Sequence, residues 1–130
     1  MVYTLGKIKK DIYKCITKEI VAEDIIITDN QMQHIFDRHP DAFDQIIESM
    51  RNILENPDYI IKDEKHENTG LVIGRNRIQN KTSDSMELVL RVYTSGSEPG
   101  YQNSIISCWK ISEKRLQNYL RNKRVLYSRE

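Results

Sequence analysis

The pattern of hydrophobic and polar positions divides the chain into four segments. The first, Gly6 to Ala22, carries isoleucines at intervals of four, at Ile8, Ile12, Ile16 and Ile20. Because residues four apart share one helical face, this spacing predicts a short strand that leads into an amphipathic helix. Isoleucine is also common in strands, so a strand remains open for this segment.

The second segment begins with a predicted strand and a predicted helix. The run from Asp24 to Thr28 contains three consecutive isoleucines, which is typical of a buried strand. Thr28 is followed three residues later by Gln31, and this pair is a capping-box signature. We therefore expect a helix that begins after Thr28 and extends to about Arg38.

Pro40 predicts a break in that helix. A proline disfavours helical backbone at the preceding residue, His39, so the helix should end there and a second one should restart at Asp41 as its N-cap. The second helix carries one apolar stripe at helical spacing and stops at Asn56-Pro57. The stripe consists of Phe43, Ile46, Ile47, Met50, Ile53 and Leu54.

The third segment lacks helical periodicity and predicts four strands. These are Asp58–Asp63, Leu71–Gln79, Met86–Ser95 and Ser104–Ile111. Their connections, at residues 65–70, 80–85 and 96–100, are rich in turn formers, as hairpins require. Strands this close in sequence favour an antiparallel sheet.

The last segment predicts a C-terminal helix. Ser112 is a good N-cap, and the helix should extend through Leu116 and Tyr119 to about Asn122, with residues 125–127 extended after it. Helices, then a run of strands, then a helix indicate the α+β fold class.

Length and composition restrict the function classes. With 130 residues, the chain fits one domain, residues 1–130, because domains usually contain about 100 to 200. Its two cysteines, Cys15 and Cys108, are too few for a disulfide framework and fit no structural zinc spacing. We find no apolar run near the ~20 residues of a membrane span and no signal peptide, so we expect a soluble, cytoplasmic protein without a membrane partner.

Charge is distributed unevenly along a nearly neutral chain. The net charge is +1, but residues 41–58 carry −4 and residues 110–130 carry +5. The basic end suits phosphate binding, although a solvated basic helix is the more common explanation. Tyr127, which follows Lys123 and Arg124, fits either base stacking at this end or anchoring of the C-terminal segment to the core.

Two histidines are the first candidates for chemistry, because imidazole has an unperturbed pKa of about 6.5, near neutrality. His34 and His39 lie five residues apart, and the break at Pro40 allows His39 to turn toward the same cleft as His34. Arg38 lies four residues after His34 and shares its helical face. A surface His34 and a helix-capping His39 explain the same pattern without chemistry.

Other site chemistries fit the sequence poorly. A spacing of five lacks the geometry of helical metal pairs, and the third histidine, His66, lies in a turn beside Glu67, which disfavours a zinc site. Ser107 has no GxSxG elbow around it, which disfavours an acyl-transfer nucleophile.

One predicted strand carries residues suited to nucleic acid. In Met86–Ser95, alternation places Arg91, Tyr93 and Ser95 on the face opposite Leu88. An arginine in mid-strand with an aromatic residue two positions later suits a phosphate and a base, although a solvated sheet face has the same pattern.

The next predicted strand offers either hydroxyl or ammonium donors. Alternation places Ser107 and Trp109 on one side of Ser104–Ile111, and Ser104, Cys108 and Lys110 on the other. Because the sequence does not assign the register between the two strands, either side of Ser104–Ile111 could lie on the same face as Arg91.

Several segments together resemble one nuclease family. They are Ile26-Ile27-Thr28, His34-Ile35-Phe36-Asp37-Arg38-His39-Pro40, Ile53-Leu54-Glu55-Asn56-Pro57-Asp58-Tyr59-Ile60, Leu88-Val89-Leu90-Arg91-Val92, Asn103-Ser104-Ile105-Ile106-Ser107 and Lys123-Arg124-Val125-Leu126-Tyr127. From Gly6 onward the sequence resembles the phage-associated barnase–EndoU–colicin E5/D–RelE-like (BECR-fold) nucleases, a prophage-borne family.

This resemblance implies a fold and a reaction. The fold is a small α+β domain in which N-terminal helices pack on a four-stranded antiparallel sheet, with RNA cleavage on the open side of the sheet and a C-terminal helix. The reaction is toxin-like, needs no metal or cofactor, and has RNA as substrate, with tRNA as one candidate. A base takes the ribose 2′-OH proton and an acid protonates the leaving oxygen. An immunity or antitoxin protein remains open as a partner.

The resemblance also implies roles for individual residues. His34 and His39 match the family's histidines and become the candidate base and acid, Arg91 matches its strand arginine as a phosphate clamp, and Ser107 falls on its Ser/Thr position. Residues placed on the substrate-binding surface are Arg38, Tyr93, Lys110, Arg124 and Tyr127. Two alternatives stay open: a nonenzymatic RNA-binding or protein-interaction module, and a metal-dependent nuclease.

Overall fold

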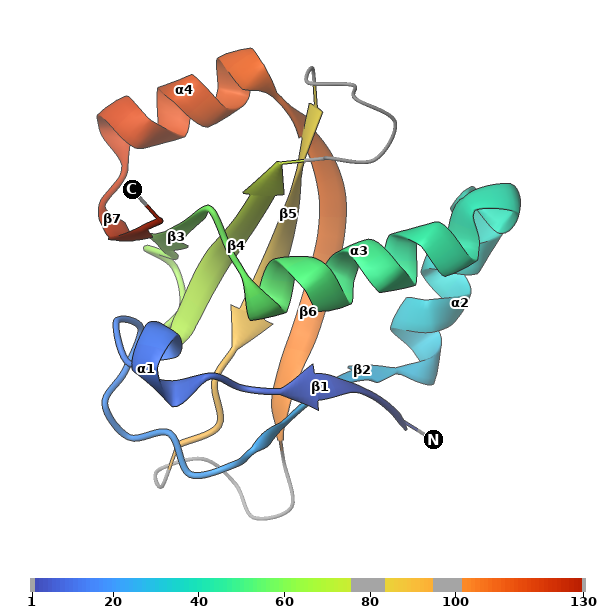
Figure 1. Ribbon diagram of the computed structural model, residues 1–130, viewed down its shortest axis with the longest axis horizontal. Helices are drawn as coiled ribbons and strands as arrows, with labels where there is room; N and C mark the ends of the chain where they lie inside the picture. The colour runs from blue at the N-terminus through green and yellow to red at the C-terminus, as the bar shows by residue number, and fades with distance from the viewer. Residues whose placement is uncertain (1, 76–83, 95–101, 130) are drawn as a thin grey trace.

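The structure, a computed structural model, describes residues 2–75, 84–94 and 102–129 (Figure 1). Its elements are β1 (Val2–Lys7), α1 (Lys10–Tyr13), β2 (Asp24–Thr28), α2 (Asp29–Arg38), a 3-10 turn (Pro40–Ala42), α3 (Phe43–Glu55), β3 (Tyr59–Lys62), β4 (Thr69–Arg75), β5 (Asp84–Arg91), β6 (Asn103–Ser112), α4 (Glu113–Asn122) and β7 (Val125–Ser128). The α+β fold class is confirmed. In the part of the chain that the structure describes, no helix has the length and apolar character needed to cross a membrane.

The sheet contains seven strands in the order β1-β2-β6-β5-β4-β3-β7. β3 to β6 pair antiparallel in chain order, as predicted, but β2 pairs parallel with β6. The prediction of a four-stranded sheet is therefore wrong. The sheet also contains β1, β2 and β7. Extended structure was predicted at Asp24–Thr28 and at residues 125–127 and is confirmed, but local periodicity carries no information about which strands pair, and β2 and β7 pair with strands distant in sequence. The predicted turn at 96–100, and the parts of predicted strands and turns at 76–83 and 95, lie outside the described residues.

The predicted helix in residues 6–22 is wrong except for one turn. α1 has only four residues, and β1 precedes it. Ile12, in α1, and Ile16 and Ile20, in the segment without regular structure that follows, all pack against the core. Isoleucine loses side-chain freedom in a helix, which disfavours the helical conformation. Residues four apart are also displaced by about 40° per step around the helix axis, so these isoleucines would not form a straight apolar stripe on one helical face.

The helix break at Pro40 is confirmed, but the predicted restart is not. His39 has φ −139° and ψ 62°, outside the helical region. Because Pro40 opens a 3-10 turn that also contains Asp41, α3 starts one residue later with Ala42 at its N-cap, and no side chain caps it. The other predicted caps are correct: the Oγ atoms of Thr28 and Ser112 each accept a backbone hydrogen bond from the first turn of α2 and α4, at 3.3 and 3.1 Å.

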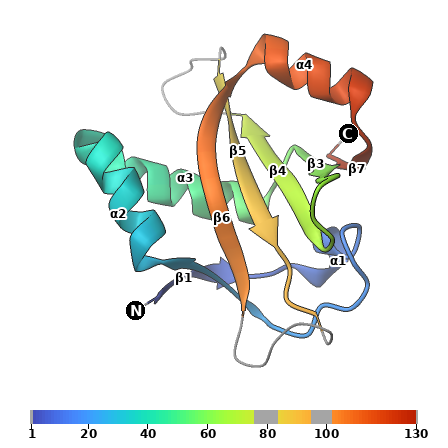
Figure 2. The same ribbon diagram turned by 180° about the vertical axis from the view of Figure 1, so that it is seen from behind.

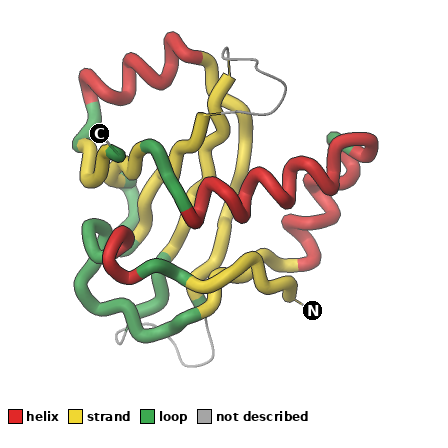
Figure 3. The backbone as a smooth tube through the Cα atoms, viewed as in Figure 1, coloured by secondary structure: helices red, strands yellow, loops and turns green. Residues whose placement is uncertain are grey.

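The two faces of the sheet are covered to different extents. α3 lies across one face, and its buried residues Met50, Ile53 and Leu54 belong to the main core (Figures 1 and 3). On the other face, α4 covers only the upper end in Figure 2, where Leu116 and Tyr119 pack with isoleucines of the sheet. The rest of β4, β5 and β6 on this side has no helix over it (Figure 2). We call this side the open face.

Candidate functional site

Strand pairing aligns side chains in rows across the open face. Opposite residues of neighbouring antiparallel strands point to the same side of a sheet. The row at Arg91 consists of Thr69, Arg91 and Ser104; the next consists of Leu71, Val89 and Ser107; the third consists of Ile73, Glu87 and Trp109. Since Ile73 packs beneath α4 on this side, all three rows lie on the open face or at the border with α4.

A β-bulge in β6 places two serines beside Arg91. The register between β5 and β6 shifts midway along the ladder, which leaves Ile106 as the extra residue. One extra residue reverses the alternation, so Ser104 joins the side of Ser107 rather than that of Cys108 as predicted. Alternation alone cannot detect a bulge.

Arg91 is a cation available to a ligand. It is exposed, and no carboxylate of residues 2–75, 84–94 or 102–129 forms an ion pair with it. Ser104 and Ser107, both half-buried, lie on the same side of the sheet. A planar guanidinium with hydroxyl groups beside it can hold a phosphate through several charge-assisted hydrogen bonds.

Two predicted binding residues lie on the other side of the sheet. Lys110 is opposite Met86, so the register supplies hydroxyl groups rather than an ammonium group beside Arg91. Tyr127 is opposite Ile60 and packs against the main core, which is the anchoring role. Lys110 was predicted as a substrate contact because the sequence does not assign the register of β6, and Tyr127 because it follows Lys123 and Arg124 at the basic end of the chain.

Tyr93 and Arg124 occupy the ends of strands. Tyr93 follows β5, and its backbone N–H donates to Oδ1 of the buried Asn103 at 2.8 Å. Arg124 is exposed just before β7, and its carbonyl accepts a hydrogen bond from Lys62 at 2.9 Å. Among the interactions of the described residues, none joins either side chain to Arg91.

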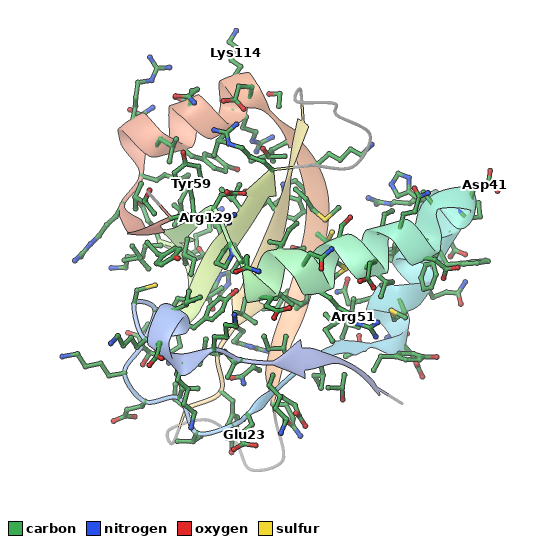
Figure 4. The ribbon with its side chains drawn as sticks, viewed as in Figure 1. Glu23, Asp41, Arg51, Tyr59, Lys114 and Arg129 are labelled. Atoms are coloured by element: carbon green, nitrogen blue, oxygen red, sulfur yellow. The ribbon has the colours of Figure 1, made fainter. Side chains whose placement is uncertain are left out.

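His34 in α2 and His39, directly after α2, lie away from the open face (Figure 2). His34, Arg38 and His39 are exposed on an arm formed by α2 and α3 beyond β6 (Figures 1 and 2). Asp41, two residues after His39, lies at the tip of this arm (Figure 4). Within the described ranges, no hydrogen bond or ion pair joins these three residues to Arg91 or Ser107, and no group of three or more His, Cys, Asp or Glu side chains could hold a metal ion.

Glu87 is a buried carboxyl group that the sequence analysis did not single out. Its side chain is 1% exposed, and neither carboxylate oxygen has a hydrogen-bond partner among the described residues. Burial raises the pKa of Glu87, whereas the nearby hydroxyl of Tyr119 and the cations Arg115 and Lys123 lower it. A glutamate in the middle of an otherwise apolar strand is the signal that could have identified it.

Arg115 in α4 and Lys123, directly after α4, lie beside the Tyr119 ring next to Glu87. Arg115 Nε donates to Tyr119 Oη at 3.2 Å, and Arg115 and Lys123 lie 5.8 and 5.4 Å from the centre of the Tyr119 ring. Both cations belong to the basic C-terminal segment. The open face is therefore bordered by positive charge along α4, and it ends in the exposed Trp109 on β6.

A family model described as phage-Barnase-EndoU-ColicinE5/D-RelE like nuclease 3 matches residues 4–118. The match contains every strand that contributes to the three rows, together with His34 and His39. Comparison with curated proteins and with solved structures returned no match.

Proposed function

This chain belongs to the phage-Barnase-EndoU-ColicinE5/D-RelE like nuclease family, and from that premise we propose that it is an endoribonuclease that binds RNA across its open face. The observation that carries the proposal is Arg91, exposed between Thr69 and Ser104 with Ser107 on the same side. It is a cation without an ion-pair partner in the described residues, on a sheet face that no helix covers there.

The proposed reaction needs no metal ion. The 2′-oxygen of the ribose forms a bond to the adjacent phosphorus while the bond from phosphorus to the leaving 5′-oxygen breaks. A base receives the 2′-OH proton, and an acid gives a proton to the 5′-oxygen. Arg91 stabilises the charge that develops on the phosphoryl oxygens, and Ser107 donates a hydrogen bond to them. The products are a 2′,3′-cyclic phosphate and a 5′-hydroxyl end.

His34 and His39 are the base and acid that the motif resemblance suggests. For both to act at a phosphate on Arg91, the RNA must extend from the open face past β6 to the arm of α2. A folded RNA such as tRNA is large enough to contact both regions, and Arg38 would then contact its backbone.

The test is to incubate the purified protein with total tRNA in excess EDTA, beside the His34→Ala/His39→Ala double variant, and to map the fragment ends. Cyclic phosphate ends from the wild type alone support the complete proposal. Equal cleavage by the double variant would remove the α2 histidines from the mechanism. Loss of cleavage in EDTA would indicate a metal-dependent nuclease.

The second candidate is a nonenzymatic RNA-binding module. It is favoured by the net charge of +5 over residues 110–130, because electrostatic attraction alone binds RNA without catalytic groups. Its signature is RNA binding that weakens steeply with salt and yields no product.

A further inference from the structure

The row of Arg91 continues beyond β4 to a residue of the preceding turn. The backbone N–H of Asp63, directly after β3, donates to the carbonyl of Thr69 at 3.3 Å and so extends the β3–β4 ladder by one pair. Thr69 is opposite Arg91, and Arg91 is opposite Ser104. Asp63, Thr69, Arg91 and Ser104 therefore form one row across four neighbouring segments, on the open face.

Asp63 holds the imidazole of His66 in this turn. His66 Nδ1 lies 3.2 Å from Asp63 Oδ2, and the other oxygen, Oδ1, accepts the backbone N–H of Lys65 at 2.9 Å. Burial raises the pKa of Asp63, but the hydrogen bonds from Lys65 and His66 outweigh it and bring the pKa below its ordinary value. An ionised carboxylate only accepts hydrogen bonds, so Nδ1 of His66 is the donor.

The second ring nitrogen of His66 is therefore available for proton transfer. The side chain of His66 is 70% exposed, whereas that of Asp63 is only 15% exposed. With Nδ1 as the donor, the neutral imidazole keeps a lone pair on Nε2. A carboxylate that sets the tautomer and orientation of a histidine prepares its second ring nitrogen to act as a general base.

The turn is also tied to the strand that carries Arg91. Val92, the next residue after Arg91, donates its backbone N–H to the carbonyl of Asn68 at 2.8 Å. Asn68 has φ 58°, in the left-handed region that asparagine tolerates better than most residues. Thr69 Oγ1 donates to the Glu67 carbonyl at 3.0 Å. These bonds fix the turn against the end of β5.

We propose that His66 is the catalytic base for a phosphodiester held by Arg91, and that Asp63 is its positioning residue. This inference rests on the proposed function and changes one assignment in it. Nε2 of His66 takes the 2′-OH proton as the 2′-oxygen bonds to phosphorus, so the α2 arm supplies at most the acid. The competing explanation is that His66 only closes the turn.

The kinetic test compares His66→Ala with Glu64→Ala, an exposed neighbour in the same turn that the mechanism does not use. We expect His66→Ala to lower kcat for RNA cleavage at least 100-fold with little change in KM, because general base catalysis contributes about that factor or more. Glu64→Ala should cleave like the wild type. Asp63→Asn should lower kcat at least 10-fold without raising KM. A purely structural role of Asp63 would not lower kcat while leaving KM unchanged.

A binding test does not depend on cleavage. A 2′-deoxy dinucleotide, which lacks the attacking hydroxyl, is added to the protein while the imidazole proton signals are followed by NMR. The signal of His66 should shift, and Arg91→Ala should remove the shift. Cleavage by His66→Ala at the wild-type rate would overturn the inference about His66, and so would a His66 signal that the dinucleotide does not shift. The proposed function would still hold in either case, provided that the wild-type protein cleaves RNA. A wild type that cleaves no RNA would overturn both.

Discussion

Arg91 lies directly opposite Ser104 across the β5–β6 ladder, and the β-bulge at Ile106 brings Ser107 to the same side. This relationship depends on the bulge, because with strict alternation Ser104 and Ser107 would point to opposite faces. Because of the bulge, two serine hydroxyl groups instead of one lie on the same side of the sheet as Arg91.

Replacement of Arg91 tests whether this side of the sheet is where RNA is cleaved. We expect Arg91→Ala to lower kcat/KM for RNA cleavage by about 100- to 1,000-fold, the usual effect of removing one group that stabilises transition-state charge. Arg91→Lys should recover only part, since lysine keeps the charge but loses the bidentate geometry. Initial rates with a fluorescent RNA measure both.

Two control variants for this test each remove one positive charge at a position away from the open face. Arg51 lies on α3, over the covered face, and its exposed contact with Glu48 spans 3.9 Å (Figure 4). Lys110 lies on the covered side of β6. We expect less than a threefold change in cleavage for Arg51→Ala and for Lys110→Ala. A loss at Lys110 equal to that at Arg91 would mean that RNA contacts the other face.

Replacement of Glu87 should change how stability depends on pH. Burial raises the pKa of Glu87, so the folded protein binds this proton more tightly than the unfolded chain does. Its stabilising contribution is complete below the unfolded pKa, about 4.3, and is lost as the pH rises through the folded value. Glu87→Gln stays neutral and should therefore be more stable than the wild type at pH 7.

Urea denaturation at pH 4 and at pH 7 measures this difference. Tyr119 and Arg115 on α4 and Lys123 directly after it favour the charged form of Glu87, whereas Asp63 disfavours it, so these groups set the size of the effect. The advantage of Glu87→Gln should disappear at pH 4. An advantage of equal size at both pH values would show that Glu87 is not protonated more readily in the folded state.

Local signals predicted the parts of the fold that local chemistry decides. The caps at Thr28 and Ser112, the break at Pro40 and the buried side of α3 all follow from residues within one or two helical turns. The pairing of β7 with β3 and of β2 with β6 could not be predicted, because these partners are distant in sequence.

The candidate site was predictable only in part for the same reason. Arg91 and Ser107 were named from their strand positions, but that they share a face depends on pairing and on the bulge. The assignment of His66 depends on the carboxylate of Asp63 three residues earlier, and a turn sequence does not show which way such a side chain points. The position of Glu87 between Met86 and Leu88 could have marked it in the sequence, but its burial could not be predicted.

Asn103 joins three segments at the start of β6, and its replacement should destabilise the fold. Its side chain is fully buried; Nδ2 donates to the carbonyls of Ala22 and Asp24 at 2.8 and 3.0 Å, and Oδ1 accepts from Tyr93. Asn103→Ala leaves these groups unpaired, so we expect a loss of about 2–4 kcal/mol in the free energy of unfolding. Gln102→Ala, at an exposed neighbour, should change it by less than about 0.5 kcal/mol. Equal urea midpoints for the two variants would contradict this role of Asn103.

Gly74 and Ile53 should show a strong energetic coupling. A Cβ atom at Gly74 would lie 2.3 Å from Ile53 Cγ1, so the absence of a side chain at Gly74 is what lets α3 approach β4. Gly74→Ala should cost about 1–3 kcal/mol through overpacking, and Ile53→Ala about 2–5 kcal/mol through loss of buried atoms. In the double variant the new methyl group occupies the space that Ile53 left, so the cost should fall at least about 1 kcal/mol below the sum of the two.

Both residues pack on the covered side, so RNA cleavage per folded molecule should stay near the wild-type value. Additive costs would mean that the helix shifts to admit the methyl group, and a loss of cleavage would mean that this shift reaches the row of Arg91.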